Sequence, residues 1–173
     1  EQSGLRSVPH AGSCGGWREV WRATRRALDS SGRAAAVELV PATLTSLRGA
    51  FERGLPLVFV MPAAPLLGAD GPQDAVPIEQ SGCGELGWLA AAHLVGWLGP
   101  VGRRTRLVVL WATGAQPVAA AMLRAGVGAV VYLRRPLGAT LAAAFAAAFV
   151  PPLLHGKPIA ATFTAACATL PPC

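Results

Sequence analysis

The stretch RLVVLW at residues 106–111 decides the fold of this chain, and it continues directly into the turn Ala112-Thr113-Gly114. A short apolar run bounded by turn residues is typical of a strand that is buried in a parallel sheet. A second run of this kind, PLVFVM at residues 56–61, continues into PAAP at residues 62–65. In open parallel sheets the functional residues lie at the carboxyl ends of neighbouring strands. Neither turn contains Cys, His, Asp, Glu or Lys, which favours an interaction domain over an enzyme.

Helix-like and strand-like patterns alternate on both sides of these two runs. Trp17, Val20, Trp21 and Leu28 recur at helical spacing, and Thr43 is a suitable N-cap for a second helix. Such alternation predicts βαβ units and therefore an α/β three-layer sandwich with a mostly parallel sheet. The predicted strands are residues 35–40, 57–61, 107–111 and 129–133, and the predicted helices are residues 17–28, 44–53, 86–98, 116–125, 138–149 and 158–170.

Proline and glycine residues predict where the regular elements stop. Residues 62–85 contain several of both and are predicted to form a long irregular loop, a kind of segment that is commonly functional or disordered. Pro151-Pro152 is predicted to break a helix. The triplet Gly126-Val127-Gly128 precedes a strand, whereas a dinucleotide-binding fingerprint follows one. It therefore indicates a tight helix-to-strand turn.

The composition is unusually apolar for a single domain of 173 residues. Hydrophobic residues make up 53% of the chain and charged residues 14%, against about 25% charged residues in typical soluble domains. The chain therefore buries a large fraction of itself or covers one face with a partner. The longest apolar run, residues 136–154, approaches the length of a membrane span, but its prolines and its many alanines favour buried helices and strands. No membrane span is predicted.

Basic residues give the chain a net charge of +6, and fourteen of the fifteen are arginines. The arginines are scattered, with small clusters at residues 25–26, 103–106 and 134–135. A single tyrosine and the absence of interleaved aromatic and basic residues disfavour nucleic-acid binding. Arg134 and Arg135 follow a predicted strand, where they would form either a basic rim for an acidic segment of a protein partner or a solvated charge pair.

Four cysteines, Cys14, Cys83, Cys167 and Cys173, are too widely spaced for a zinc site, and no histidine adds metal-ligand spacing. No metal and no cofactor is therefore predicted. Free thiols indicate a reducing compartment, and we expect the cytoplasm. Cys83 is expected to be a loop thiol and Cys167 to be buried in the last helix. A chain that begins at Glu1 without Met or a signal peptide is expected to be a fragment or a processed product.

The histidines have structural explanations in the same patterns. His93 lies in the apolar stripe of the helix predicted at residues 86–98, which indicates a core or helix-face residue. His155 lies at a helix junction, which indicates a cap or a surface group.

Three segments together resemble CHAT domains, which are caspase-like peptidase domains often attached to TPR repeats. The first is ATRRALDSSGRAAAVELVPATLTSLRGAFERGLPLVFV, the second is GELGWLAAAHLVGWLGPVGRRTRLVVLWATG, and the third runs from MLRAGVGAVVYLRRPLG to the helix near residue 170. The resemblance covers residues 17–170, which leaves residues 1–16 as a linker and residues 171–173 as a tail. It implies a caspase-like fold.

The resemblance fails at both positions that matter for peptidase chemistry. The family has a His-Gly after the strand that corresponds to residues 57–61, and here Ala63 takes the position of the histidine. The family has its nucleophilic cysteine after the next strand, and here Thr113 takes that position. A cysteine peptidase needs a thiolate with a base in hydrogen-bond reach. The resemblance therefore implies no catalytic residue and an inactive domain that acts as a scaffold or protein-interaction module.

Two other functions stay open at this point. The stretches PLVFVMPAAPLLGADG and TRLVVLWATGAQPVAAAMLRAGVGAVVYLRRPL resemble receiver (flavodoxin-like) signalling domains, although residues 59–61 lack the phospho-acceptor aspartate, so this would be a pseudo-receiver. The other alternative is a cysteine-dependent enzyme of unrecognised type that uses residues 62–85.

Overall fold

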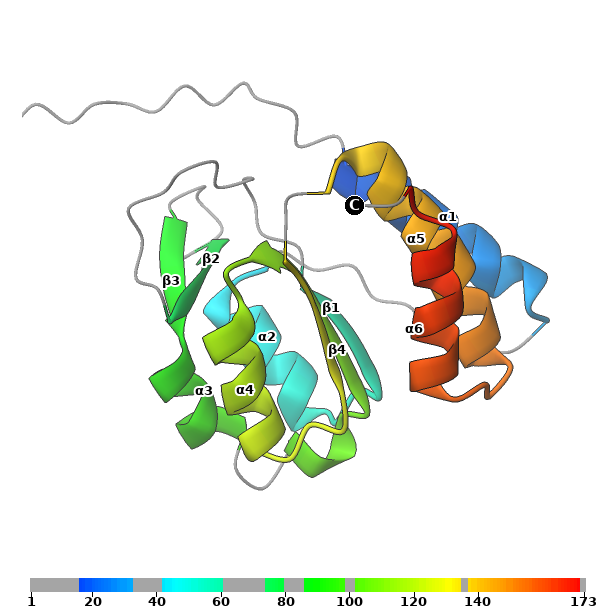
Figure 1. Cartoon of the computed structure of the whole chain (residues 1–173). Coiled ribbons are helices and arrows are strands. Elements are labelled where there is room, and N and C mark those ends of the chain that lie inside the picture. The colour runs from blue at the N-terminus through cyan, green and yellow to red at the C-terminus, as the bar shows by residue number, and fades with distance from the viewer. Residues whose placement is uncertain are drawn as a thin grey trace, which may run out of the picture.

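The computed structural model of the protein describes residues 16–32, 42–60, 74–79, 86–98, 102–134 and 137–171. Helices and strands alternate from β3 to α5, which bears out the predicted alternation for this part of the chain (Figure 1). In chain order, the elements are α1 (Gly16–Ser30), α2 (Leu44–Glu52), β1 (Leu57–Val60), β2 (Ala75–Glu79), β3 (Leu86–Ala90), α3 (Ala91–Leu98), the 3-10 helix η1 (Gly102–Arg104), β4 (Leu107–Thr113), α4 (Gln116–Arg124), β5 (Val130–Leu133), α5 (Ala139–Leu154) and α6 (Ile159–Ala168).

A parallel sheet forms the centre of the fold, with strand order β1-β4-β5. Leu57 pairs with Leu107, and Val108 pairs with Val130, so both neighbours of β4 run in its direction. The predicted mostly parallel sheet is confirmed for these strands. The strand predicted at residues 35–40 lies outside the described residues.

Helices cover both faces of this sheet, which gives three layers (Figure 1). Successive side chains of a strand point to opposite faces. Val108 and Leu110 of β4 accordingly lie in the core shared with α2, α3 and α4. Leu107 and Val109 lie in the core shared with α5 and α6. The predicted three-layer arrangement therefore rests on the two-sided burial of one strand.

The layer of α1, α5 and α6 is held together by small side chains. Val20 of α1 packs against Ala142 and Ala146 of α5, and all three are almost fully buried. Figure 1 shows α1 lying along α5. Because alanine has only a methyl group, the two helix backbones can approach closely. This contact fixes α1 to the body of the domain.

The local signals for helix ends act as predicted. The Thr43 hydroxyl accepts a hydrogen bond from the Ser46 N–H at 3.1 Å and so caps α2. At the other end of that helix, Gly54 has a φ of +65°, which a residue with a side chain rarely adopts. The turn between α4 and β5 also forms where the glycines at 126 and 128 predict it.

Residues 86–98 correct the prediction of one buried helix. The first five of them form strand β3, which pairs antiparallel with β2, and the helix α3 begins only at Ala91. Leu89 in the strand and Leu94 in the helix are both fully buried, so the apolar pattern of these residues is compatible with either structure. A short apolar run does not distinguish the two structures, and here the pairing with β2 decides in favour of the strand.

Strand β2 corrects the prediction that residues 62–85 are irregular. Ala75–Glu79 is a strand even though it contains Pro77, which lacks an N–H. Within the described residues β2 pairs with β3 alone, and a strand with one unpaired edge can accommodate a proline on that edge. Val76 and Ile78 are fully buried and point into the core of the α2–α4 layer.

The predicted helix break at Pro151-Pro152 is also wrong. Helix α5 continues through both prolines to Leu154, and the His155 N–H then bonds to the Pro151 carbonyl at 3.2 Å. The prolines remove hydrogen bonds only to the carbonyls of Ala147 and Ala148. Because one more helical turn follows and packs on the sheet through Leu153, the helix tolerates this loss.

The long apolar run that prompted the question of a membrane span forms α5, which has 16 residues. In the ranges that the structure describes, no helix combines the length and the apolar character that crossing a membrane requires.

The close contact of α1 with α5 leads to a prediction about stability. Ala146→Leu should lower the free energy of unfolding by about 1–3 kcal/mol, because the larger side chain has no space between the two helices. The matched control is Ala144→Leu, since Ala144 lies on the same helix but is exposed. Urea denaturation of the two variants measures the difference. Equal stability of the two would contradict the close packing.

A second stability prediction concerns the turn before β5. A Cβ atom added at Gly128 would lie 2.9 Å from the backbone oxygen of Arg106, so Gly128→Ala should destabilise the domain by about 1–3 kcal/mol. The control is Gly96→Ala on α3, where an added Cβ meets nothing within 4 Å. It should stabilise by up to about 1 kcal/mol, because alanine favours a helix. Thermal unfolding of both variants tests the opposite signs.

Candidate functional site

The carboxyl edge of the parallel sheet is the first place where a functional site would be expected. Strand β4 reaches this edge at Thr113, which pairs with Leu133 of β5 after an irregularity in the register that begins at Leu110. Gly114 then turns the chain with a φ of +69°, and Ala115 is fully buried where α4 begins. Of the described residues that follow β4 at this edge, neither Gly114 nor Ala115 has a functional side chain.

Two residues were predicted to replace the family's catalytic pair at this edge. Thr113 lies at the end of β4, two residues beyond the predicted end of that strand. Ala63 lies outside the described residues, so its position opposite Thr113 stays a prediction. Trp111 lies on the side of the sheet that α5 covers. The centroid of its ring is 5.6 Å from the centroid of the Phe145 ring on α5.

Groups with the chemistry of a nucleophile or a base are dispersed. Cys167 is on α6, and His93 is on α3 in the opposite layer of the sandwich. His155 caps the end of α5, with its Nδ1 2.8 Å from the Pro151 carbonyl oxygen. Cys167 lies about 12 Å along the α6 axis from the first residue of α6. Among the described residues, His93 and Cys167 therefore belong to different helical layers.

One of these residues lies elsewhere than predicted. Cys167 is exposed rather than buried, because the buried residues of α6 are Thr162 and Ala166, one turn apart on another side of the helix. His93 is exposed on α3, which agrees with the helix-face alternative and not with the core alternative. His155 is exposed at a helix end, as predicted. Cys14, Cys83 and Cys173 lie outside the described residues.

Metal binding has no candidate cluster in the described ranges, where no group of three or more His, Cys, Asp or Glu residues lies together. Asp74 is exposed immediately before β2, and Asp70 lies outside the described residues.

A face of helix α1 has the most distinctive chemistry of the described surface. Arg22, Arg25 and Arg26 are exposed there, with the half-buried Trp21 beside them. We call these four residues the α1 arginine face. They line a shallow depression that is broadly open to solvent.

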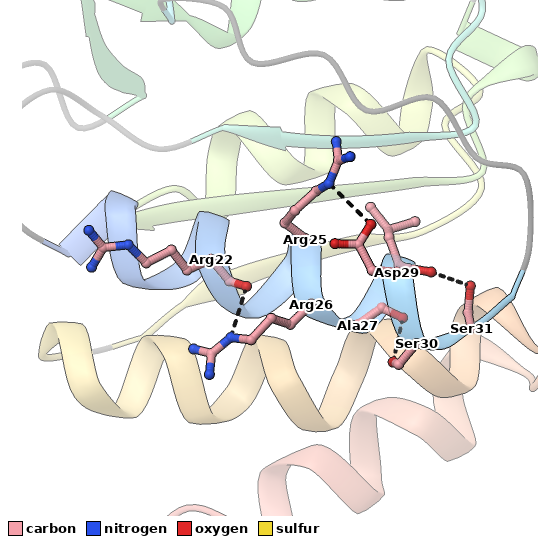
Figure 2. Close-up of polar contacts among 8 residues, drawn as sticks. Arg22, Arg25, Arg26, Ala27, Asp29, Ser30 and Ser31 are labelled. Carbon is pink, nitrogen blue, oxygen red and sulfur yellow. Dashed lines mark hydrogen bonds and ion pairs between the residues drawn. The ribbon is translucent and has the colours of Figure 1, made fainter.

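The internal contacts of this face lie along the helix (Figure 2). Arg25 Nε lies 3.2 Å from an oxygen of Asp29, one turn further along, and the side chains of both residues are more than half exposed. Arg26 Nε donates to the Arg22 carbonyl at 3.3 Å. The helix ends where the Ser30 and Ser31 hydroxyls donate to the carbonyls of Ala27 and Leu28.

The amphipathic pattern of α1 explains why the arginines gather on one side. Val20, Ala23, Ala27 and Leu28 are buried, and they occupy one side of a helix with a period of 3.6 residues. The arginines occupy the opposite side, and Trp21 lies at the boundary next to Leu28. Sequence reasoning missed this face, since it grouped Trp21 with the apolar residues at helical spacing and treated Arg25 and Arg26 as one small cluster in a scattered set. The sequence signal that could have predicted this face is the spacing of the arginines, which places them on the side of the helix opposite Ala23 and Ala27.

The other predicted basic clusters have different surroundings. A Cβ at Gly54 would meet the side chain of Arg104, and one at Gly126 would meet Arg103, so the stems of these two arginines lie over glycines at helix ends. Arg134 is exposed just after β5, which is compatible with a basic rim and with a solvated charge alike, and Arg135 lies outside the described residues. The described arginines therefore do not form one continuous track.

Comparisons with protein-family models and with curated proteins found no match for this sequence.

The environment of Cys167 gives a prediction about its reactivity. Partial burial raises the pKa of its thiol, so less of it is thiolate at neutral pH than of an unstructured cysteine. Its alkylation by iodoacetamide should therefore be slower at neutral pH than that of a cysteine in a short reference peptide, and should accelerate as the pH rises through the raised pKa. Mass spectrometry of the peptide that contains Cys167 separates it from the other cysteines. Faster reaction than the reference would indicate an activated thiol.

Proposed function

We propose that this protein is a catalytically inactive caspase-like (CHAT-like) domain that acts as a scaffold or protein-interaction module. The observation behind the proposal is Thr113, which ends β4 at the sheet edge where the resemblance expects the nucleophilic cysteine. A threonine hydroxyl is a weak nucleophile unless an adjacent base activates it. The resemblance expects that base at Ala63, which has no titratable group.

The chemistry of the surrounding residues supports the same proposal. Partial burial raises the pKa of the exposed Cys167 thiol, which is the opposite of the change that activates a nucleophilic cysteine. The histidines at 93 and 155 lie on elements remote from Thr113 in the fold, one on the outer side of α3 and one at the far end of α5.

The described surface supports a role in binding other proteins. Helix α6 contains no charged residue, although seven of its ten residues are exposed, among them Phe163 at 38%. Contiguous apolar surface of this kind often marks a protein interface. Interfaces are also enriched in Trp and Arg, which the α1 arginine face provides. A partner, or TPR repeats of the kind attached to CHAT domains, would cover such surfaces in a reducing compartment such as the cytoplasm.

The pseudo-receiver alternative has less support. Between β1 and β4 the chain forms the β2–β3 pair and α3, whereas a receiver-like repeat would place a single crossover helix there. The chain also ends its described part with two consecutive helices, α5 and α6, on one face of the sheet.

The proposal predicts binding without cleavage. The folded chain should leave a diverse peptide library intact, as measured by mass spectrometry of the library before and after incubation. The same chain, immobilised, should enrich particular sequences from a displayed peptide library. Cleavage that disappears in Thr113→Ala or Cys167→Ala, with the fold retained by circular dichroism, would refute the inactive domain. Enrichment no greater than on a urea-unfolded sample would refute the interaction module.

A further inference from the structure

We infer that the α1 arginine face is a docking site for an acidic peptide segment of a partner protein. This inference deepens the proposed function and rests on it, because it assigns one surface of the interaction module and the chemistry of its ligand. The face consists of Trp21, Arg22, Arg25 and Arg26, and these four residues line the shallow depression on α1.

The helix that presents the face is a firm support. Its other side is buried through Val20, Ala23 and Ala27, with Val20 packed against Ala142 and Ala146 of α5. A binding surface on a packed helix keeps its geometry better than one on a loop. Arg22 and Arg26 are one helical turn apart, about 6 Å along the axis, so their positions relative to each other are set by the helix.

The side chains on this face match a carboxylate ligand. Guanidinium groups form planar, paired hydrogen bonds to carboxylates, and such bonds are stronger than those between neutral groups. Trp21 adds an apolar anchor with one N–H donor beside these charges. Aromatic residues and arginine are the types that most often dominate the binding energy of an interface.

The present partners of the arginines are easily exchanged for a ligand. The Arg25–Asp29 pair has side chains that are 57% and 63% exposed, and exposed ion pairs of this kind contribute little to stability. The bond from Arg26 Nε to the Arg22 carbonyl uses only one of the donors of the guanidinium group. Carboxylates from a partner can therefore engage these arginines without disturbing the fold.

We expect the acidic ligand to come from outside this sequence. Within this sequence Asp70 and Asp74 are the only two acidic residues as close as one helical turn, so the sequence contains no longer acidic run. A second copy also has a net charge of +6 and would be repelled.

A peptide fits the face better than a nucleic acid does. Glu19 and Asp29 on the same helix leave only a small local excess of positive charge. The arginines near η1 lie over Gly54 and Gly126, on the side of the sheet opposite α1, so they do not extend the face into a track for a long polyanion. A short segment with carboxylates spaced about one helical turn apart matches the span of Arg22 and Arg26.

The test measures binding of a short fluorescent peptide rich in Glu and Leu to the full 173-residue chain by fluorescence anisotropy. The double charge reversal Arg22→Glu with Arg26→Glu should weaken binding about tenfold or more, and Trp21→Ala should also weaken it. The matched control reverses Arg106 and Arg124, which are exposed, lie outside α1 and change the net charge equally. Circular dichroism verifies that each variant is folded. Higher salt should weaken binding to the unaltered chain.

Several outcomes would overturn the inference. Equal loss of binding in the two double reversals would show attraction to net charge rather than to this face. A single-stranded oligonucleotide or an anionic lipid vesicle that binds more tightly than the peptide, and loses binding in the Arg22/Arg26 variant, would assign the face to a polyanion. If library peptides bind the chain at another surface and Glu-rich peptides do not bind α1, this inference is wrong, but the proposed function as an interaction module is retained.

Discussion

The two-sided burial of strand β4 is the constraint on which the rest of the structure depends. Four successive residues, Leu107 to Leu110, are at most 2% exposed and alternate between the two helical layers. A strand with apolar side chains on both faces is stable only when both faces are covered. The parallel partners β1 and β5, the α2–α4 layer and the α1–α5–α6 layer all follow from this requirement.

The same constraint determines what the carboxyl edge of the sheet can do. Ala112 and Ala115 are buried where the chain leaves β4, whereas Gly114 and Arg134 at the same edge are exposed. Arg22, Arg25 and Arg26 form a group of exposed arginines on the outer side of α1. The buried alanines at the sheet edge and this charged helix face are together the physical basis for proposing binding rather than catalysis.

Sequence patterns predicted the parts of the fold that depend on local regularity. Period-2 and continuous apolar runs located β1, β4 and β5 within a few residues, and Thr43 capped its helix, because these signals act between residues that are close in the chain. The patterns failed where two structures bury the same residues. Leu89 is buried whether its segment is a helix or a strand, so only the pairing of β3 with β2 distinguishes them.

By itself, the sequence determined a parallel α/β arrangement, the turn at Gly126-Val127-Gly128 and a threonine at the end of the central strand. Only the tertiary structure decided which sides of the helices are covered. Neighbouring helices and strands determine that Cys167 and His93 face outward and that α1 presents Trp21 with its arginines. The physical reason is that burial depends on the helices and strands that pack around a residue. A helical pattern shows which residues lie on the same side of a helix, but it does not show whether another element covers that side.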